Sequence, residues 1–235
     1  MRLHLLRHLS MIALLLSAVI IMLMSQFTHL DLMIEDYYFD QTTQTFVWKN
    51  TWFAKDFMHN DIKKIITAFG GAWLCITCLD VLYPLRNIDN LIRLRLRLVA
   101  IAAVLVPLLI TILKRMSALH CPWDVQRYGG NAPYLRLLDT VPQGVNAGHC
   151  FPAGHASTGL WLAALCVFWL PHRPKIARLV FLTGLSVGFL LGWVQQMRGA
   201  HFLSHTLWSM WLASLVIVLL IKINQTKLEQ HAYNN

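Results

Sequence analysis

Long apolar runs alternate with short polar segments along most of the chain. A helix that crosses a lipid bilayer needs about 17–25 mainly apolar residues, and six runs reach or approach this length. They occupy residues 9–29, 65–85, 97–113, 155–171, 176–197 and 202–222. This pattern predicts an all-α integral membrane protein, built as a bundle of six transmembrane helices.

Two longer segments separate some of these runs. Residues 30–64 are rich in Trp, Tyr and Phe. Because aromatic side chains favour the bilayer interface, we expect this segment to lie on the outer membrane surface, with residues 52–58 as either an interfacial helix or an ordinary loop. Residues 116–152 contain several Pro and Gly turn signals, which predict irregular structure packed over the membrane domain.

The composition agrees with one membrane domain. Of the 235 residues, 57% are hydrophobic and only 13% are charged, which is rare in a soluble domain of this size. We expect a single domain over residues 1–235, with a core at about residues 60–222 and a tail at 223–235. The first run is not followed by a small-residue cleavage site, so it predicts a retained span and not a secretory signal peptide.

Basic and acidic residues are divided between the two ends of the predicted bundle. Most acidic residues lie in segments 30–64 and 116–152, whereas 11 of the 20 basic residues flank the termini and the connections after the second and fourth runs. The latter are Arg2, Arg7, Arg86, Arg93, Arg95, Arg97, Arg173, Lys175, Arg178, Lys222 and Lys227. The positive-inside rule places their end, with both termini, in the cytoplasm. In a bacterial cell the other end would face the periplasm from the inner membrane.

The net charge of +9 is explained by this topology and by contact with anionic lipids. A nucleic-acid partner is disfavoured, because the arginines lie beside the predicted spans and are not gathered on a soluble domain. The bilayer itself is the expected partner.

Four histidines lie in two short polar stretches at the outer mouths of the apolar runs. His149 and His155 belong to the first stretch, and His201 and His205 to the second. Ionisable groups kept at membrane depth usually mark chemistry or transport. In a metal-binding protein these four imidazoles would be zinc ligands. Haem ligation is disfavoured because the histidines lie at the ends of the runs and not at mid-span.

Other groups around the histidines favour an anion. Gly154 and His155 begin an apolar run, and the free N–H groups of a helix start attract phosphate. Arg198, His201 and His205 fall on one helix face, because they are three and four residues apart. The simpler interpretation of both stretches is interfacial histidine beside a snorkelling arginine.

Lys114 and Arg127 add positive charge at the same surface. Lys114 ends the third run, and Arg127 follows in the next segment. Together with Arg198 and the helix start at His155, they would surround a single oxyanion. Phosphoryl transfer requires such positioning, because charge spreads over the phosphoryl oxygens in the transition state.

The five cysteines fall in two environments. Cys75, Cys78 and Cys166 lie in apolar runs, where a free cysteine behaves as a small buried hydrophobe. Cys121 and Cys150 lie in the outer segment, where oxidation is allowed. A disulfide between these two and a pair of free thiols are equally open alternatives.

Three short motifs follow one another along the chain. They are Lys114…Pro122, Pro152-x-Gly154-His155 and Arg198-Gly199-x-His201. Their order and spacing resemble the three-motif pattern of the type 2 phosphatidic acid phosphatase superfamily, over about residues 60–220. The resemblance implies a six-span membrane enzyme that removes phosphate from lipid phosphates or pyrophosphates. It also implies a phosphohistidine intermediate and no metal or other cofactor.

The resemblance assigns roles to three residues. His201 would be the nucleophile, His155 would be the general acid that protonates the leaving oxygen, and Lys114 would bind the phosphoryl oxygens. A covalent intermediate divides hydrolysis into two easier steps.

The chain departs from the family pattern at four positions. Cys121 stands in place of an Arg, Ala153 in place of a Ser, Gln195 in place of an Arg and His205 in place of an Asp. Arg198 lies one helical turn from Gln195 and would replace the arginine of the third motif. Arg127 would do the same for the first motif.

His205 would accept a hydrogen bond from His201 and fix its tautomer, as an acid does in a catalytic triad. Asp124 is a second candidate for the missing acid. The departures also leave an inactive family member as an alternative.

We therefore expect a lipid phosphatase with its active site on the outer face. Its substrate would be a membrane lipid phosphate, such as undecaprenyl pyrophosphate, phosphatidylglycerol phosphate, phosphatidic acid or a lipid A phosphate. The sequence indicates no obligate protein partner. The alternatives are a metal-binding membrane protein and a non-catalytic binder or transporter of lipid phosphates, which would use the same cationic pocket.

Overall fold

The structure is a computed structural model that describes the backbone of residues 2–84, 86 and 88–233. Side chains are described for residues 11–84, 86 and 88–232. The predictions made for the charges of Arg2 and Arg7 lie outside the described side chains.

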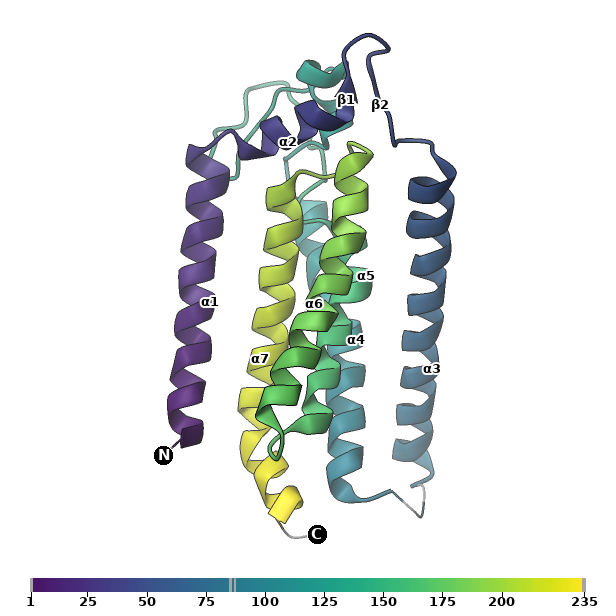
Figure 1. The fold of residues 1–235 in the computed structure, drawn as a ribbon, viewed down its shortest axis with the longest axis vertical. Helices are drawn as coiled ribbons and strands as arrows, with labels where there is room; N and C mark the ends of the chain where they lie inside the picture. The colour runs from purple at the N-terminus through teal and green to yellow at the C-terminus, as the bar shows by residue number, and fades with distance from the viewer. Residues whose placement is uncertain (1, 85, 87, 234–235) are drawn as a thin grey trace.

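Long helices run the length of the molecule, and shorter elements cover one end (Figure 1). The long helices are α1 (Arg2–Phe27), α3 (Ile62–Leu82), α4 (Asn90–Met116), α6 (Pro174–Met197) and α7 (Leu203–Tyr233), accompanied by α5 (Gly154–Leu160) and its 3₁₀ continuation η4 (Trp161–Trp169). The shorter elements are α2 (Leu30–Tyr38), the antiparallel strands β1 (Phe39–Asp40) and β2 (Thr45–Phe46), the π-helix η1 (Trp52–Asp61), and the 3₁₀ turns η2 (Pro122–Asp124) and η3 (Gln126–Tyr128).

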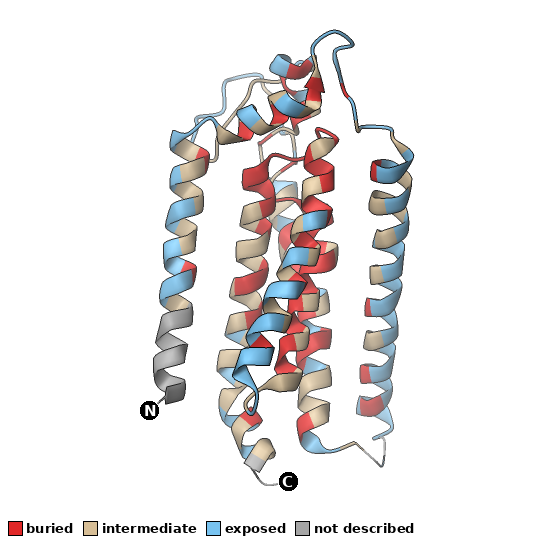
Figure 2. Cartoon of the chain, viewed as in Figure 1, coloured by how far each residue is buried: buried red, intermediate tan, exposed pale blue. Residues whose placement is uncertain are grey.

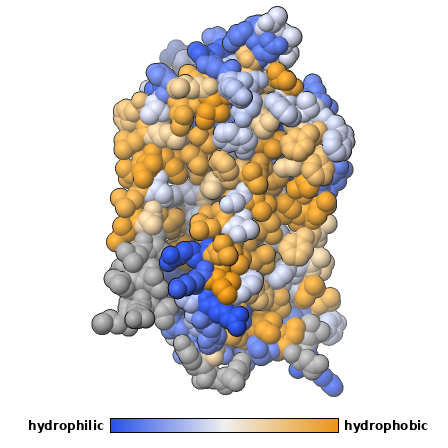
Figure 3. All heavy atoms as spheres, viewed as in Figure 1, coloured by the Kyte–Doolittle hydropathy of each residue, from blue (hydrophilic) through white to orange (hydrophobic). Residues whose placement is uncertain are grey.

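Helices α4, α5, α6 and α7 form the centre of the bundle, and α1 and α3 flank it on opposite sides (Figure 1). Buried residues concentrate in the central helices near the end covered by α2, whereas α1 and α3 are mostly exposed (Figure 2). Among the described side chains of α1, at residues 11–27, the exposed ones are apolar: Ile20, for example, is 65% exposed. An apolar band also covers the middle of the face drawn in Figure 3, and hydrophilic residues gather at the α2 end. Lipid is the solvent that suits such a surface.

Four helices are long and apolar enough to cross a membrane in the part of the chain that the structure describes. They are Trp52–Leu82, which joins η1 to α3, Asn90–Met116, Pro174–Met197 and Leu203–Ala232. A fifth span results if α1 and α2, which meet at 67°, count as one broken span. The fold is thus mostly helical with four to five candidate membrane spans, as the apolar runs indicated, and the number six stays a prediction.

The fourth apolar run, predicted at residues 155–171, differs most from an ordinary transmembrane helix. It contains only 7 α-helical residues, followed by 9 residues of 3₁₀ helix. A 3₁₀ helix rises about 2.0 Å per residue against about 1.5 Å in an α-helix, so the two pieces together extend about 28 Å. The tighter winding lets a short run approach the thickness of a bilayer core.

Both termini lie at one end of the bundle, and α2 with the long outer segments lies at the other (Figure 1). The tail predicted at residues 223–235 is helical up to Tyr233, since α7 continues through it. The segment predicted as the loop 30–64 is mostly regular structure, because it holds α2, the β-hairpin and η1. The candidate interfacial helix at residues 52–58 is the start of a π-helix that leads directly into α3.

The outer end has its own small hydrophobic core. Phe39 and Phe46 from the hairpin pack against Tyr128 and Phe202, with ring centroids of Phe39, Phe46 and Tyr128 5.1–5.3 Å apart. Arg136 donates hydrogen bonds to the backbone oxygens at residues 26 and 28, where α1 turns into α2. These contacts tie the irregular segment 116–152 to the N-terminal third of the chain.

Glycines set the close contact between α6 and the α5–η4 unit. A Cβ atom on Gly184 would overlap the backbone of Ala163, and one on Gly188 would overlap the side chain of Leu160. The helix backbones therefore touch where a larger side chain would hold them apart. By contrast, a Cβ atom on Gly71 in α3 would meet nothing within 4 Å.

We predict that Gly184→Leu destabilises the bundle by about 1–3 kcal/mol or more, the usual cost of overpacking a tight core. The matched variant Gly71→Leu keeps wild-type stability, because its side chain enters open space on α3. Thermal unfolding of both purified proteins in one detergent measures the difference. Equal melting temperatures for the two variants would contradict this account of the α6 contact.

Candidate active site

Lys114 and the start of α5 come together at the outer end of the bundle. A Cβ atom placed on Gly154 would lie 3.5 Å from Cδ and 3.8 Å from Nζ of Lys114. The lysine therefore extends along the first turn of α5, and the absence of a side chain at Gly154 leaves room for it. The two predicted phosphate-binding residues, separated by 40 positions in the sequence, are neighbours in the fold.

His155 lies next in α5, with its ring enclosed by protein. The residue is 8% exposed, neither Nδ1 nor Nε2 makes a well-formed hydrogen bond, and the backbone of Met58 interacts with the ring. Its ring stacks on His59, with centroids 4.4 Å apart. Buried polar atoms without well-formed hydrogen bonds are costly, so this ring has capacity to bind a ligand.

His59 and Lys63 are members of the site that the sequence did not reveal. His59 lies in η1, and Lys63 lies at the start of α3, one helical turn further on. The charge of Lys63 acts on Lys114, His59 and His155. The sequence signals these two residues only by their place near the end of an aromatic segment. Their contact with His155 and Lys114 depends on how α3 packs beside α5, which no local pattern records.

His201 sits in the tight turn that joins α6 to α7. Gly199 in this turn has a φ of +73°, and a Cβ atom there would overlap the ring of Phe46, so the position requires glycine. His201 is 4% exposed. Burial lowers the pKa of the His201 imidazole well below its ordinary value, so the ring is neutral at pH 7 and keeps a free lone pair.

Cys150 contacts the His201 ring with its sulfur atom and with its backbone. The Nδ1 atom of His201 lies 3.4 Å from Sγ of Cys150, and the backbone of Cys150 also interacts with the His201 and His205 rings. Sγ of Cys150 is 3.2 Å from the backbone oxygen of Ala200. A residue that entered the prediction only as half of a disulfide therefore lies against the predicted nucleophile.

Cys121 and Cys150 are joined by a disulfide, and their Cα atoms are 5.3 Å apart. The bond closes a loop across 29 positions of the sequence. It links the segment after α4 to the segment before α5, so it supports Lys114 and His155 as well as His201.

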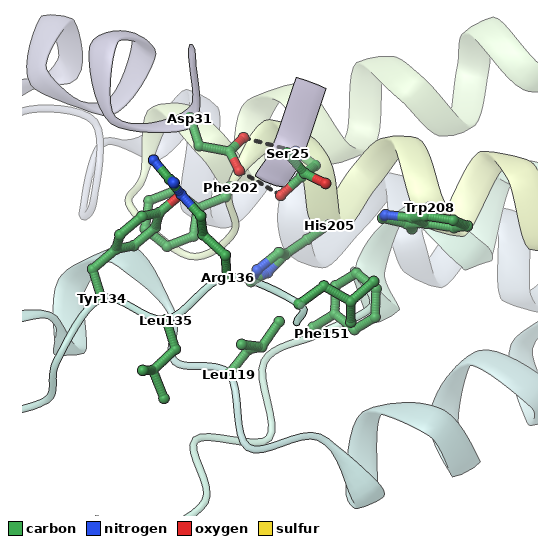
Figure 4. Close-up of a pocket in the computed structure, with 12 residues that line it drawn as sticks. Ser25, Asp31, Leu119, Tyr134, Leu135, Arg136, Phe151, Phe202, His205 and Trp208 are labelled. Carbon is green, nitrogen blue, oxygen red and sulfur yellow. Dashed lines mark hydrogen bonds between the residues drawn. The ribbon is translucent and has the colours of Figure 1, made fainter. Parts of the chain in front are cut away.

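His205 lies one turn into α7, with its ring edge-to-face to His201 at a centroid distance of 5.8 Å. The rings of Phe151 and Phe202 also pack against the His205 ring, each with a centroid distance of 5.4 Å. Its Nδ1 atom is buried without a partner, and the ring points into a small cavity of about 10 Å³ (Figure 4). The two imidazoles are neighbours, but the described residues show no hydrogen bond between them.

Asp31 from α2 borders the cavity that His205 faces (Figure 4). This carboxylate is 5% exposed and accepts hydrogen bonds from the backbone N–H and the hydroxyl of Ser204. It caps the first turn of α7 from outside the helix. A buried acid thus lies beside the histidine that replaced the family's acid, although the two are 174 positions apart.

Gln195 lies in the last turn of α6, and Arg198 is the residue that ends this helix. The helix stops before His201 and α7 begins at Leu203, so the prediction that Arg198, His201 and His205 share one helix face is wrong. Nη1 of Arg198 donates to Oε1 of Gln195 at 2.9 Å, and its Nε donates to the backbone oxygen of Lys49 at 3.1 Å. Burial lowers the pKa of the Arg198 guanidinium from its ordinary value, yet the group stays charged at neutral pH. Its positive charge acts on His59 and His155.

The structure does not bring the remaining predicted residues into this group. Arg127 is exposed and bound by both carboxylate oxygens of Asp36, at 2.7 and 2.8 Å, so it lies outside this group and its phosphate contact stays a prediction. Asp124 is exposed as well, and His149 lies in a turn with its side chain exposed. The cause is the same for all three, because the segment 116–152 folds over α2 and directs these side chains outward.

The four histidines do not form a metal centre. Within the described part of the chain, one group of three metal-ligating side chains has its donor atoms within 4.8 Å of one another: Cys121, Cys150 and His201. Two of these donors are consumed by the disulfide. The zinc site predicted from four imidazoles finds no support in this arrangement.

Comparison with known proteins gives one match. The family model of the PAP2 superfamily matches residues 94–229, a range that contains Lys114, His155, Arg198 and His201. No curated protein and no solved structure matches the chain.

We predict that removing the disulfide lowers the free energy of unfolding by about 3–4 kcal/mol, the value expected when a loop of this length is no longer closed. Cys121→Ser and Cys150→Ser should then unfold at a lower temperature than the wild type, whereas Cys166→Ser, which has no bond to lose, should change little. Alkylation and mass spectrometry of the unreduced wild type should detect three free thiols. Alkylation of all five cysteines in the unreduced protein would show that Cys121 and Cys150 are not bonded.

Proposed function

Because the chain belongs to the PAP2 superfamily, we propose that it is a membrane phosphatase that hydrolyses the phosphomonoester or pyrophosphate of a lipid through a phosphohistidine intermediate. The observation that carries the proposal is that the buried imidazoles of His155 and His201 lie close enough to interact, within reach of the positive charges of Lys114, Lys63 and Arg198. A phosphoryl group needs this combination of nucleophile, acid and cationic clamp.

In the first step, Nε2 of His201 attacks the phosphorus atom and the bond to the lipid oxygen breaks. The leaving oxygen takes a proton from His155. Lys114 and Arg198 hold the phosphoryl oxygens while negative charge spreads over them. The result is a phosphorylated His201 and a lipid that has lost its terminal phosphate.

In the second step, a water molecule attacks the phosphorylated His201. His155, now neutral, accepts a proton from that water, and inorganic phosphate leaves with the imidazole restored. The roles of acid and base alternate on one residue, as general acid–base catalysis requires over a full cycle. No metal enters either step.

Orientation of the nucleophile falls to Cys150 in this proposal. Nδ1 of His201 lies 3.4 Å from Sγ of Cys150, so a proton on Nδ1 would leave the lone pair on Nε2 for the substrate. The family's acid is absent from this place, since His205 occupies its position in the sequence.

The proposed location is the outer face of a bacterial inner membrane. We infer six crossings, with the α5–η4 unit as the shortest, and with the termini in the cytoplasm. The basic residues between α3 and α4 and between η4 and α6 support this orientation, since these connections share the end at which both termini lie (Figure 1). Substrate would come from the outer leaflet, and undecaprenyl pyrophosphate, phosphatidylglycerol phosphate, phosphatidic acid and lipid A phosphates are the candidates.

We predict that His201→Ala and His155→Ala abolish phosphate release from a panel of these lipids, whereas Arg127→Gln keeps the wild-type rate. Loss of the general acid alone should cost about 10²–10⁴-fold in kcat. Released phosphate is measured with purified protein in mixed micelles that contain a chelator, because the proposed reaction needs no metal. A wild-type rate for His201→Ala would exclude the proposed nucleophile, and a chelator-sensitive rate would exclude the metal-free mechanism.

We predict that His205→Asp impairs the protein, although it restores the residue usual for the family. The new carboxylate would be buried beside Asp31, and a buried charge without a partner costs about 3–5 kcal/mol. Adding Asp31→Asn removes the second charge, so the double variant should recover stability and activity relative to His205→Asp. Thermal unfolding and phosphate release test this, with Asp31→Asn as the control. Full stability of the single variant would contradict the prediction.

A further inference from the structure

Three metal-ligating atoms meet at the base of the active site. Sγ of Cys121, Sγ of Cys150 and a ring nitrogen of His201 all lie within 4.8 Å of one another. Cys150 is fully buried and Cys121 is partly exposed. The disulfide keeps both sulfur atoms from binding a metal, since the thiolate is the form that ligates.

The backbone holds these three residues in place independently of the disulfide. The N–H groups of residues 148, 149 and 150 donate to the backbone oxygens of residues 118, 117 and 119, at 2.9–3.1 Å. The N–H of Trp123 donates to the backbone oxygen of Gly199 at 3.0 Å. Breaking the S–S bond therefore leaves two thiols and an imidazole close together, on segments that are still paired.

We propose that the reduced protein has a binding site for a thiophilic divalent metal ion, formed by Cys121, Cys150 and His201, and that metal bound there blocks the nucleophile. Two thiolates and one imidazole are a ligand set that zinc favours, and a small molecule or water completes the tetrahedron. The metal-binding part of the inference stands by itself, and the blocking of His201 rests on the proposed phosphatase function.

The metal site forms in two steps, reduction of the disulfide and then binding of the metal ion. A dithiol reductant transfers two electrons to the S–S bond, which breaks into two thiols while the reductant closes to its own disulfide. The metal ion then binds both sulfur atoms as thiolates and Nδ1 of His201; the two thiol protons leave, and the imidazole proton moves from Nδ1 to Nε2. With metal at Nδ1 and a proton at Nε2, the ring has no lone pair left to attack phosphorus.

The inference predicts a response to two signals together. Oxidised protein keeps its activity in the presence of zinc, because no thiolate is available. Reduced protein without zinc keeps an unblocked His201. Reductant and zinc together should stop turnover, and a chelator should restore it.

The test uses full-length protein in which Cys75, Cys78 and Cys166 are changed to Ala, so that other thiols do not bind metal. After reduction with dithiothreitol and anaerobic removal of the reductant, zinc binding is measured by competition with a chromogenic chelator. We expect about one zinc ion per chain, bound at least about tenfold more tightly than by the oxidised protein. Zinc should also raise the melting temperature of the reduced protein alone.

His201→Gln in the same background keeps both cysteines and removes one ligand, so its zinc affinity after reduction should fall at least about tenfold. Its melting temperature in the oxidised state confirms that it folds, and His149→Gln is the matched histidine control. Equal zinc binding by oxidised and reduced protein, or unchanged binding by His201→Gln, would overturn the proposed site.

Phosphate release separates this inference from the proposed function. Zinc should inhibit the reduced protein at least about tenfold more strongly than the oxidised protein. Full activity of zinc-loaded, reduced protein would overturn the blocking of His201. A protein that binds zinc as expected but releases no phosphate in any state would refute the phosphatase and leave the metal site supported.

Discussion

The backbone pairing of residues 117–119 with residues 148–150 is the contact on which the site depends. Irregular backbone beside a membrane has to satisfy its N–H and C=O groups within the protein, and here the two segments satisfy each other. Lys114 precedes this pairing by three residues and His155 follows it by five, so their positions are fixed relative to each other. The disulfide between Cys121 and Cys150 reinforces the same junction and places Cys150 against His201.

Burial gives the histidines their chemical character. His201 is neutral because the protein around it excludes water, and a neutral imidazole is a nucleophile whereas its protonated form is not. Neither ring nitrogen of His155 makes a well-formed hydrogen bond within the protein, which leaves the ring able to bind a substrate. His205 is enclosed by Phe151 and Phe202 and faces Asp31, so it belongs to the support of the site. Lys114 and Arg198 supply the positive charge that a phosphoryl group would meet.

The outer layer explains which predicted residues fall outside the site. Segment 116–152 is held by the aromatic core that Phe39, Phe46 and Tyr128 form, and by the hydrogen bonds of Arg136 to the α1–α2 turn. In this position Arg127 meets Asp36 and not a phosphate. A charged residue that lies near a motif in the sequence, such as Arg127, can therefore stabilise the layer that covers the candidate site and take no part in binding a ligand.

The sequence by itself determined the helical membrane fold, the common end of the two termini, and the places of Lys114, His155, Arg198 and His201, because these depend on apolar run length and on short motifs at helix ends. Only the tertiary structure decided that His59 and Lys63 join them, that Asp31 faces His205, and that Cys150 lies against His201. Each of these contacts links segments far apart in the chain, and no local pattern of hydrophobic or polar positions records how one helix packs beside another. The close approach of α6 to the fourth run is likewise a tertiary contact, made at Gly184 and Gly188.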